Sequence, residues 1–332
     1  MRAIDCPSGH HLEATDDAEL LRRCREHIAE HHPDMQRTDE QLRERVAVDA
    51  YDANLLAYHR HPVTRSPPEE ALPMTTAARQ LNTTELKHRV QSMYEEVALE
   101  PDREFHFETG RPLAERLGYP PEDLDAIPAA AIDSFAGVGY FLDLAAIAPG
   151  ETVLDLGSGS GMDSFLAALQ TGPGGHVVGV DMTDAQLAKA RRLGEEDDFG
   201  AVEFREAYIE TPPVHEASVD CVISNGVINL SPDKAAVFAA AARALRSGGR
   251  LALADIVTEH QLPEGVTCDA ALWAACIGGA MQRDGYREAI QATGFTIEAW
   301  RENTEYRFVS KRADNATQKY GVTSISLLAR RR

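Results

Sequence analysis

The chain has 332 residues, 43% of them hydrophobic, which is enough for two domains or for one domain with additions. Its formal net charge of -20 gives a surface that repels phosphate backbones and argues against a nucleic-acid partner. The sequence shows no membrane span, no signal peptide and no closely spaced cysteine framework, so we expect a cytoplasmic protein with free thiols.

Residues 1–60 are predicted to form a small separate module. The stretch DDAELLRRCREHIAEHH has apolar residues at helical spacing, and Asp16 or Asp17 is placed to cap this helix. A second helix is expected to begin at Thr38. The following stretch, residues 61–81, is rich in proline and polar residues and is interpreted as a linker.

The first helix also carries a pattern that suggests a metal site. Cys24, His27 and His31 fall on one helix face, and Cys6 would complete a tetrahedral zinc set. The stretch resembles a small domain of unknown function that begins Cys-x-Cys-Gly-His, but Ser8 replaces the second cysteine. We interpret the stretch instead as a helix with solvated histidines and a packed cysteine, and expect no bound metal. The module would then shield the active site or mediate association, with a homodimer as one candidate.

Residues 82–149 are predicted to form a helical cap, beginning with a helix over TTELKHRVQSMYEEVAL. Residues 150–332 then alternate short apolar strands with helices, which predicts an α/β, Rossmann-like sheet with helices on both faces. Its ligand is expected beyond the carboxyl ends of the strands. Ser231 is placed to cap the helix SPDKAAVFAAAARALRSGG, and the tail YGVTSISLLARR is expected to close the sheet as an antiparallel strand.

The segment LDLGSGSG, residues 154–161, combines a strand with a glycine-rich turn. A phosphate-binding P-loop would end in Gly-Lys-Ser/Thr, whereas this run continues into Met162 and Asp163. A dinucleotide fingerprint starting at Gly157 would need glycine at position 162. The glycines instead alternate after Asp155, a pattern suited to a ligand that carries cationic groups rather than phosphates.

This alternation resembles motif I of the class I S-adenosylmethionine-dependent methyltransferases. The resemblance implies that the turn approaches the amino-acid portion of S-adenosylmethionine, which is the expected cofactor. It implies that Asp181 accepts both ribose hydroxyls, as acids also do in NAD sites, and that residues 207–210 surround adenine. The expected cofactor-binding residues are Asp155, Gly157, Ser158, Gly159, Gly161, Asp181, Met182, Ile209, Glu210, Asn225 and Gly226.

Residues 151–183 and 222–238 are similar to the arsenite methyltransferase branch of these enzymes, a resemblance that covers about residues 82–332. It implies methyl transfer to arsenic held by three thiolates, since a soft metalloid prefers sulfur. Cys276, in CIGGA, matches one of the three cysteine positions. The loop SFAGVGYF lacks the second cysteine, and Gly226 occupies the position of the third.

Three functions follow from these patterns. The first is an S-adenosylmethionine-dependent methyltransferase with a small-molecule acceptor, for which Tyr94, His106, Glu108 and Cys276 are the candidate catalytic residues. His106 and Glu108 would share one side of an extended stretch, although both also fit a surface polar pair. The alternatives are an arsenite methyltransferase that uses Cys276, and a metal-binding or scaffolding protein with a vestigial core.

Overall fold

The computed structural model describes residues 2–5, 11–31, 38, 42–43, 46, 51–52, 82–267, 273, 277–309 and 317–332. The chain divides into two compact units, residues 1–76 and 77–332. Each unit has its own cluster of buried apolar side chains. The finer predicted boundaries at residues 60, 81 and 149 stay predictions.

The first unit joins a three-stranded antiparallel sheet to one long helix. The sheet has the order β2-β1-β3, and its strands are β1 (Arg2–Asp5), β2 (His11–Ala14) and β3 (Tyr51–Asp52). The helix α1 (Asp17–His31) contacts β1 and β2. Asp16 caps the helix as predicted, because its Oδ1 accepts the backbone N–H of Glu19 at 2.9 Å. Leu20, Cys24 and Val46 form the core of this unit. The rest of the predicted second helix lies mostly outside the described residues.

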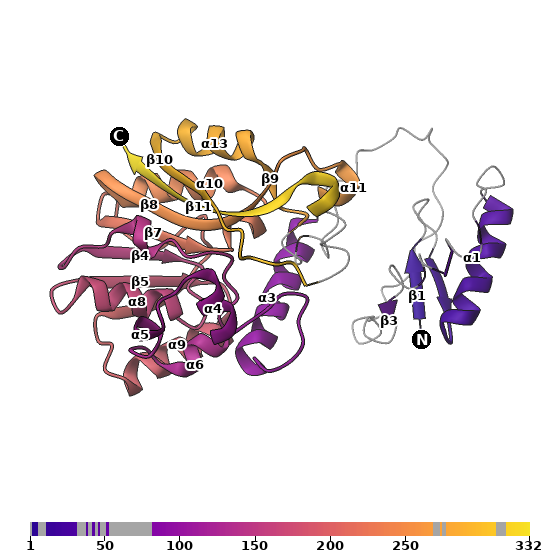
Figure 1. Ribbon diagram of the computed structural model, residues 1–332, viewed down its shortest axis with the longest axis horizontal. Coiled ribbons are helices and arrows are strands. Elements are labelled where there is room, and N and C mark those ends of the chain that lie inside the picture. Colours follow the sequence, from indigo (N-terminus) through magenta and orange to yellow (C-terminus); the bar gives the residue numbers. More distant parts are fainter. Residues whose placement is uncertain are drawn as a thin grey trace, which may run out of the picture. The chain divides into compact units, whose positions relative to one another are not determined.

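The second unit is built on an eight-stranded mixed sheet (Figure 1). Its main path is β10-β11-β8-β7-β4-β5-β6, and β9 pairs with β8. β11 runs antiparallel between β8 and β10, which confirms the predicted closing strand. The strands are β4 (Thr152–Leu156), β5 (His176–Asp181), β6 (Val202–Glu206), β7 (Val219–Asn225), β8 (Leu245–Thr258), β9 (Met281–Gln282), β10 (Phe295–Glu302) and β11 (Val322–Arg331).

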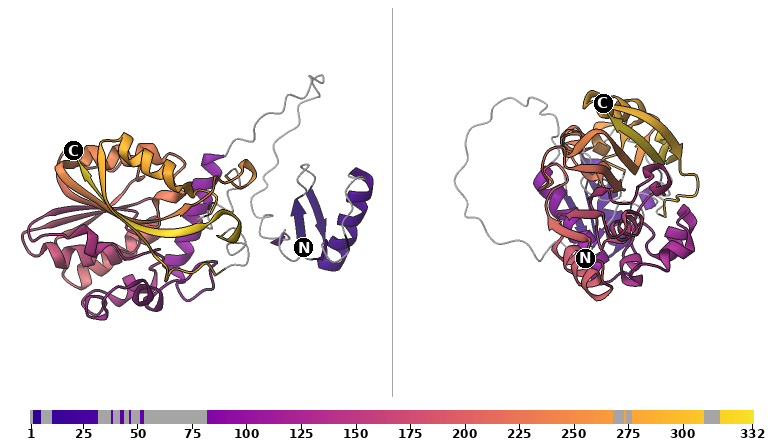
Figure 2. Two further views of the ribbon diagram at one scale, coloured as in Figure 1. Left: turned by 45° about the horizontal axis from the view of Figure 1, so that its top comes forward. Right: turned by 90° about the vertical axis from the view of Figure 1, so that its left-hand side faces the viewer.

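The helices of the second unit form layers on both faces of this sheet. Figures 1 and 2 show α8 and α9 on one face and α10 and α13 on the other, while α3 crosses one end of the sheet. Within the described residues, no helix has both the length and the apolar character that crossing a membrane requires. The helices are α3 (Thr83–Leu99), α4 (Arg111–Leu117), α5 (Pro121–Leu124), α6 (Ala129–Asp133), α7 (Leu142–Ala145), α8 (Met162–Thr171), α9 (Asp184–Glu196), α10 (Lys234–Ala244), α11 (Glu264–Thr267) and α13 (Arg283–Ala292), with the 3-10 turn η3 (Ile228–Leu230).

The layered arrangement follows from strands that are apolar on both faces. Val153 packs with Phe165 of α8, whereas its neighbour Leu154 belongs to the opposite cluster, with Phe238 of α10. Side chains alternate between the faces of a strand, so TVLDL, with Val153 and Leu154 on opposite faces, needs a cover on each side. The Rossmann-like α/β fold predicted from the sequence is therefore confirmed.

The start of α10 differs from the prediction. Asp233, and not Ser231, is the N-cap, and its Oδ1 accepts the backbone N–H of Ala236 at 2.9 Å. The Ser231 hydroxyl instead donates to Glu210 Oε1 at 2.6 Å and accepts the Asp233 N–H at 3.1 Å. Ser and Asp are both good caps, so the sequence did not show that the serine is used by a neighbouring loop.

Loss of the Tyr286 hydroxyl is expected to lower the free energy of unfolding by about 1–3 kcal/mol. Tyr286 is fully buried, and its hydroxyl donates to Oδ2 of the equally buried Asp255 at 2.6 Å. Tyr286→Phe leaves that oxygen without its donor. Denaturant unfolding measures the change, with the half-buried Tyr320→Phe as the matched control. Equal stability losses in the two variants would contradict this assignment.

Candidate functional site

Two adjoining cavities lie at the carboxyl ends of β4, β5 and β7. They share four wall residues, Gly157, Asp181, Val227 and Leu230. We call the one lined by the acids of the glycine turn the polar cavity, and the one lined by residues 207–210 the apolar cavity. This is the edge of the sheet at which the sequence places the ligand.

The glycine turn is held against β5 and opens toward both cavities. The backbone N–H groups of Gly157 and Ser158 both donate to Val180 O, at 2.8 and 3.0 Å. Gly157 has φ +80°, and a Cβ there would meet Val227 Cγ2 at 2.4 Å. Gly159 has φ +52°, and a Cβ there would meet nothing closer than 3.8 Å. The turn thus needs glycine for its conformation, and at Gly159 it leaves space for a ligand.

Asp181 links the end of β5 to the glycine turn. Its Oδ2 accepts the Gly159 N–H at 3.0 Å, and its Oδ1 accepts the Thr183 N–H at 2.8 Å. Burial raises the pKa of Asp181, and these backbone donors partly offset that rise. Thr183 lies at the N-cap of α9, but its side chain makes no capping hydrogen bond. A carboxylate oxygen has more than one lone pair, so both oxygens can still accept ligand hydroxyls.

The polar cavity holds two further buried acids. Asp155 accepts the Ser164 hydroxyl at 2.6 Å, and burial, followed by the nearby charge of Asp163, raises its pKa to about 8. Burial raises the pKa of Asp163 to about 6. No Lys, Arg or His is among the described residues that line this cavity. The cavity therefore suits a ligand that brings its own positive charge.

Ser158 contributes an unused polar atom to the same cavity. Its Oγ is buried and has no hydrogen-bond partner within the part of the chain that the structure describes. A buried hydroxyl without a partner costs free energy, which a polar ligand can recover. The residues present thus fit the amino-acid portion of S-adenosylmethionine, with acids for the ammonium group and a hydroxyl for a further polar contact.

Asn225 is a centre of the protein's own hydrogen bonds. Its Oδ1 accepts the Val138 N–H at 2.8 Å, and its Nδ2 lies 3.1 Å from Asp163 Oδ2 and 3.0 Å from Gly139 O. The buried Tyr119 hydroxyl donates to Asp163 Oδ1 at 2.6 Å. Asn225 lines the polar cavity, but its amide ties the loop between α6 and α7 to the start of α8.

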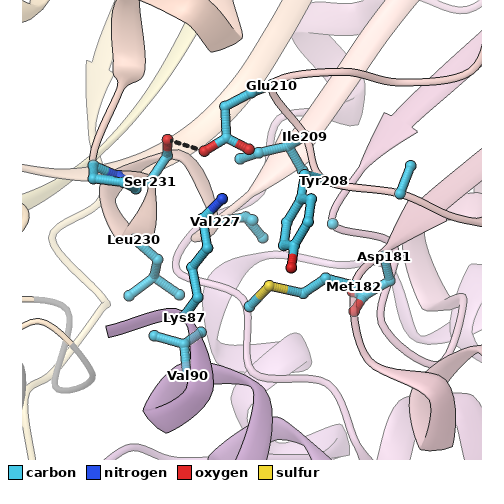
Figure 3. Close-up of a pocket in the computed structure, with 13 residues that line it drawn as sticks. Lys87, Val90, Asp181, Met182, Tyr208, Ile209, Glu210, Val227, Leu230 and Ser231 are labelled. Atoms are coloured by element: carbon cyan, nitrogen blue, oxygen red, sulfur yellow. Dashed lines mark hydrogen bonds between the residues drawn. The ribbon is translucent and has the colours of Figure 1, made fainter. Parts of the chain in front are cut away.

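The apolar cavity is formed by side chains from four parts of the chain (Figure 3). Tyr208 and Met182 point toward one another, and Lys87 reaches in from α3. The Lys87 ammonium lies 3.9 Å from the centroid of the Tyr208 ring. The remaining labelled wall residues are Val90, Asp181, Ile209, Glu210, Val227, Leu230 and Ser231. A flat heteroaromatic ring with a polar edge fits such a cavity.

The candidate catalytic residues are not all brought to these cavities. Tyr94 lines the polar cavity. Glu108 accepts a hydrogen bond from Arg116, and the His106 ring packs edge-on against Phe107 with 4.8 Å between ring centroids. Neither His106 nor Glu108 is among the described wall residues of the two cavities. Cys276 lies outside the described residues.

Gly226, at one of the two cysteine positions that this chain lacks, lies beside the loop in which the resemblance expects the other. Gly226 follows β7 with φ +71°, and a Cβ there would meet Val138 Cγ1 of the loop SFAGVGYF at 3.1 Å. A valine side chain and a glycine without a side chain therefore meet at this point. Neither can bind a soft metalloid through sulfur.

The predicted metal pattern is not assembled in the described part of the first unit. Cys24 is packed as expected, at 8% exposure, but the expectation of a solvated His27 is wrong, because this side chain is also buried, at 7% exposure. Among the described residues, no group of three or more His, Cys, Asp or Glu is placed to hold a metal ion. Cys6 and the side chain of His31 lie outside that description, so the expectation that this unit binds no metal stays untested.

Sequence reasoning missed three residues of this site. Lys87 stands in a helix that the sequence marks only by periodicity, and nothing local links it to residue 208. Asp163 and Tyr119 are far apart in the chain, and their contact depends on the packing of α8 against the cap. The one available signal was Asp163 in the GMD sequence at the end of the glycine turn, because an acid at the start of an apolar helix needs a partner.

Comparison with known proteins points to one kind of enzyme. Residues 147–306 match the family model described as Methyltransferase domain. The arsenite methyltransferase of Halobacterium salinarum is 43% identical over 204 residues, which is 61% of this chain and 52% of that protein. The nocamycin O-methyltransferase of Saccharothrix syringae is 35% identical over 142 residues, 41% of this chain and 51% of that protein. Matches thus span about half the length of these curated relatives.

A solved structure supports the same assignment. The crystal structure of an arsenic(III) S-adenosylmethionine methyltransferase from Chlamydomonas reinhardtii is 29% identical with a TM-score of 0.51. The match covers 67% of this chain and 73% of the algal chain. These similarities confirm the predicted resemblance to class I methyltransferases and to their arsenite branch.

Proposed function

We propose that this chain is an S-adenosylmethionine-dependent methyltransferase that acts on a small-molecule acceptor. The observation that carries the proposal is the pair of adjoining cavities, one lined by buried acids and the other by apolar side chains. S-adenosylmethionine supplies an electrophilic methyl group on a sulfonium, so the protein needs chiefly to bind, align and exclude water. The match of residues 147–306 to the methyltransferase model supports the same function.

Each part of the cofactor has a region of the site that suits its chemistry. Asp155 and Ser158 are assigned to the amino-acid portion and Asp181 to the ribose hydroxyls. Met182, Ile209 and the Tyr208 ring are assigned to adenine, which gains from burial against apolar and aromatic groups. The buried acids of the polar cavity disfavour a phosphate ligand, since like charges repel strongly where water is excluded.

The acceptor is expected to approach from the polar cavity on the side of Tyr94. This residue lines the cavity with Phe135 and Gly137 of the cap, so an acceptor there would contact both the cap and the glycine turn. Tyr94 is our candidate for orienting the reacting groups, and His106 and Glu108 stay candidates for a base that moves in with the acceptor. Homodimer formation and a cytoplasmic location are further expectations of this proposal.

The proposal is tested by cofactor binding and label transfer with the full chain. Calorimetry with S-adenosylmethionine is expected to show one site with micromolar or tighter affinity. Incubation of the protein and methyl-labelled cofactor with a small-molecule extract is then expected to give a labelled product, identified by mass. Absence of any heat of binding at cofactor concentrations far above the protein concentration would remove the proposal.

Arsenite methylation is the second candidate, because the arsenite methyltransferase of Halobacterium salinarum shares 43% identity with this chain. Glycine at position 226 and the absence of cysteine from the loop SFAGVGYF speak against a three-thiolate site. Incubation with arsenite, glutathione and labelled cofactor decides between the candidates. Methylated arsenic that depends on Cys276, lost in Cys276→Ser, would favour this candidate over another acceptor.

A further inference from the structure

Lys234 is a buried cation that the proposed cofactor site does not use. It closes the NLSPDK stretch and begins α10, with 6% of its surface exposed. Its Nζ donates to the backbone carbonyl oxygens of Asn229 and Ser231, at 3.1 and 3.0 Å. These two residues flank Leu230, which lines both cavities. The ammonium thus braces the turn that walls the cofactor site.

The same ammonium contacts a second segment, which is far away in the sequence. It lies 4.8 Å from the centroid of the Trp273 indole, which is itself buried and donates to Thr267 O at 2.6 Å. Gly279 fits closely between the two segments, because a Cβ there would lie 1.9 Å from Asn229 O and 2.6 Å from Trp273 Cε3. The turn, the lysine and the indole form one packed unit.

Two carboxylates act on this ammonium within the part of the chain that the structure describes. They are Asp255 on β8 and Glu210 after β6. Asp255 accepts hydrogen bonds from Tyr286 and Asn229, at 2.6 and 2.7 Å, and so faces α13 and the turn. Glu210 accepts the hydroxyl of Ser231, whose carbonyl oxygen accepts from Lys234. The cation is therefore connected to the cofactor cavity through Ser231.

We propose that Lys234 is a positioning residue that fixes Trp273 against the turn Asn229–Ser231, and thereby holds this wall of the cofactor cavities closed. A cation over an indole in a site without water contributes more than an exposed pair. Two carbonyl oxygens and one ring satisfy the ammonium, so replacing the lysine by methionine frees all three groups, whereas loss of its proton chiefly weakens the contact with the ring. Its effect on the cofactor rests on the proposed function, whereas its effect on Trp273 does not.

The titration of Lys234 gives a readout that a merely structural role would not produce. Burial lowers the pKa of Lys234 to about 8, and the charges of Asp255 and Glu210 act in the opposite direction. The chain has two tryptophans, so Trp300→Phe leaves Trp273 as the only one. In that protein, the emission of Trp273 is expected to change with a midpoint near pH 8, as the ammonium loses its proton. This measurement needs no substitution at position 234.

A second variant shows whether Lys234 causes this pH-dependent change in emission. Adding Lys234→Met to Trp300→Phe is expected to abolish the titration and to shift the emission to longer wavelength as water reaches the indole. Asp255 is retained there, so a transition that persists would belong to another group and overturn the proposal. Lys319→Met is the matched control, because exposed Lys319 lies 5.2 Å from the Tyr320 ring, and it should leave the transition unchanged.

Calorimetry adds the link to the cofactor. Lys234→Met is expected to weaken S-adenosylmethionine binding about tenfold, while Lys319→Met should not. Unchanged affinity in Lys234→Met would overturn the inferred effect on the cavity wall. If the unsubstituted protein shows no binding at all, the proposed function fails, and the pH transition of Trp273 still tests the positioning of the indole.

Discussion

Replacing Asp181 by alanine is expected to weaken S-adenosylmethionine binding by at least about 100-fold, because hydrogen bonds to a charged group contribute roughly 1.5–3 kcal/mol each. The carboxylate accepts the backbone N–H of Gly159 and that of Thr183. The substitution therefore removes the acceptor assigned to the ribose and also one of the hydrogen bonds that hold the glycine turn against β5. Calorimetry with the cofactor measures the loss.

Two variants separate these contributions. Asp181→Asn retains the shape and can still accept one backbone N–H, so it should fall between the wild type and the alanine variant. Asp184→Ala removes an exposed carboxylate three residues away in the first turn of α9 and should bind as the wild type does. Equal affinity of Asp181→Ala and Asp184→Ala would show that the ribose is held elsewhere.

Local patterns predicted the core of the fold well. The stretches TVLDL, HVVGVD and VDCVISN became β4, β5 and β7, because apolar strands bounded by turn residues have few other ways to bury both faces. The glycine turn also took the predicted place after β4. In each of these cases the chain needed only neighbours in sequence to define the structure.

The features that the sequence did not predict depend on contacts between segments that are far apart in the chain. Ser231 looked like a helix cap, but Glu210 of another loop uses its hydroxyl, and Asp233 caps α10 instead. Sequence analysis did not single out Lys234, whose surroundings include the distant Trp273. Residue type alone gave no means of ranking these choices, since serine and aspartate cap helices equally well.

The acids of the polar cavity show the same limit and also give the site its chemistry. Sequence analysis placed Asp155 beside the turn but could not show that Asp163 is buried next to it. Asp163 Oδ1 accepts the hydroxyl of Tyr119, which comes from the cap. Two neighbouring carboxyls without a cation in the described cavity wall raise the cost of ionising either one. A cationic ligand reverses that cost.

Stability without ligand is accordingly expected to fall as the pH rises, and Asp155→Asn should remove most of this fall above pH 6. Burial raises the pKa of Asp155 from 3.8 to about 8. Between these values the folded protein holds a proton that the unfolded chain has released, so the free energy of unfolding decreases with rising pH. Asparagine has no proton to lose and can still accept the Ser164 hydroxyl. At pH 8.5 the variant should be more stable than the wild type by about 2 kcal/mol.

Denaturant unfolding at pH 5.5, 7 and 8.5 measures this effect, with exposed Asp184→Asn as the control that should follow the wild type. Asp163 remains in the variant, and burial raises its pKa only to about 6. Its contribution to the pH dependence of the free energy of unfolding is therefore confined to the lower part of this pH range. With S-adenosylmethionine present, the ammonium of the ligand favours ionised Asp155. The stabilisation by ligand should therefore grow with pH in the wild type and stay nearly flat above pH 6.5 in Asp155→Asn. If the stabilisation by ligand changes with pH in the same way in the two proteins, Asp155 is not the group that contacts the ammonium.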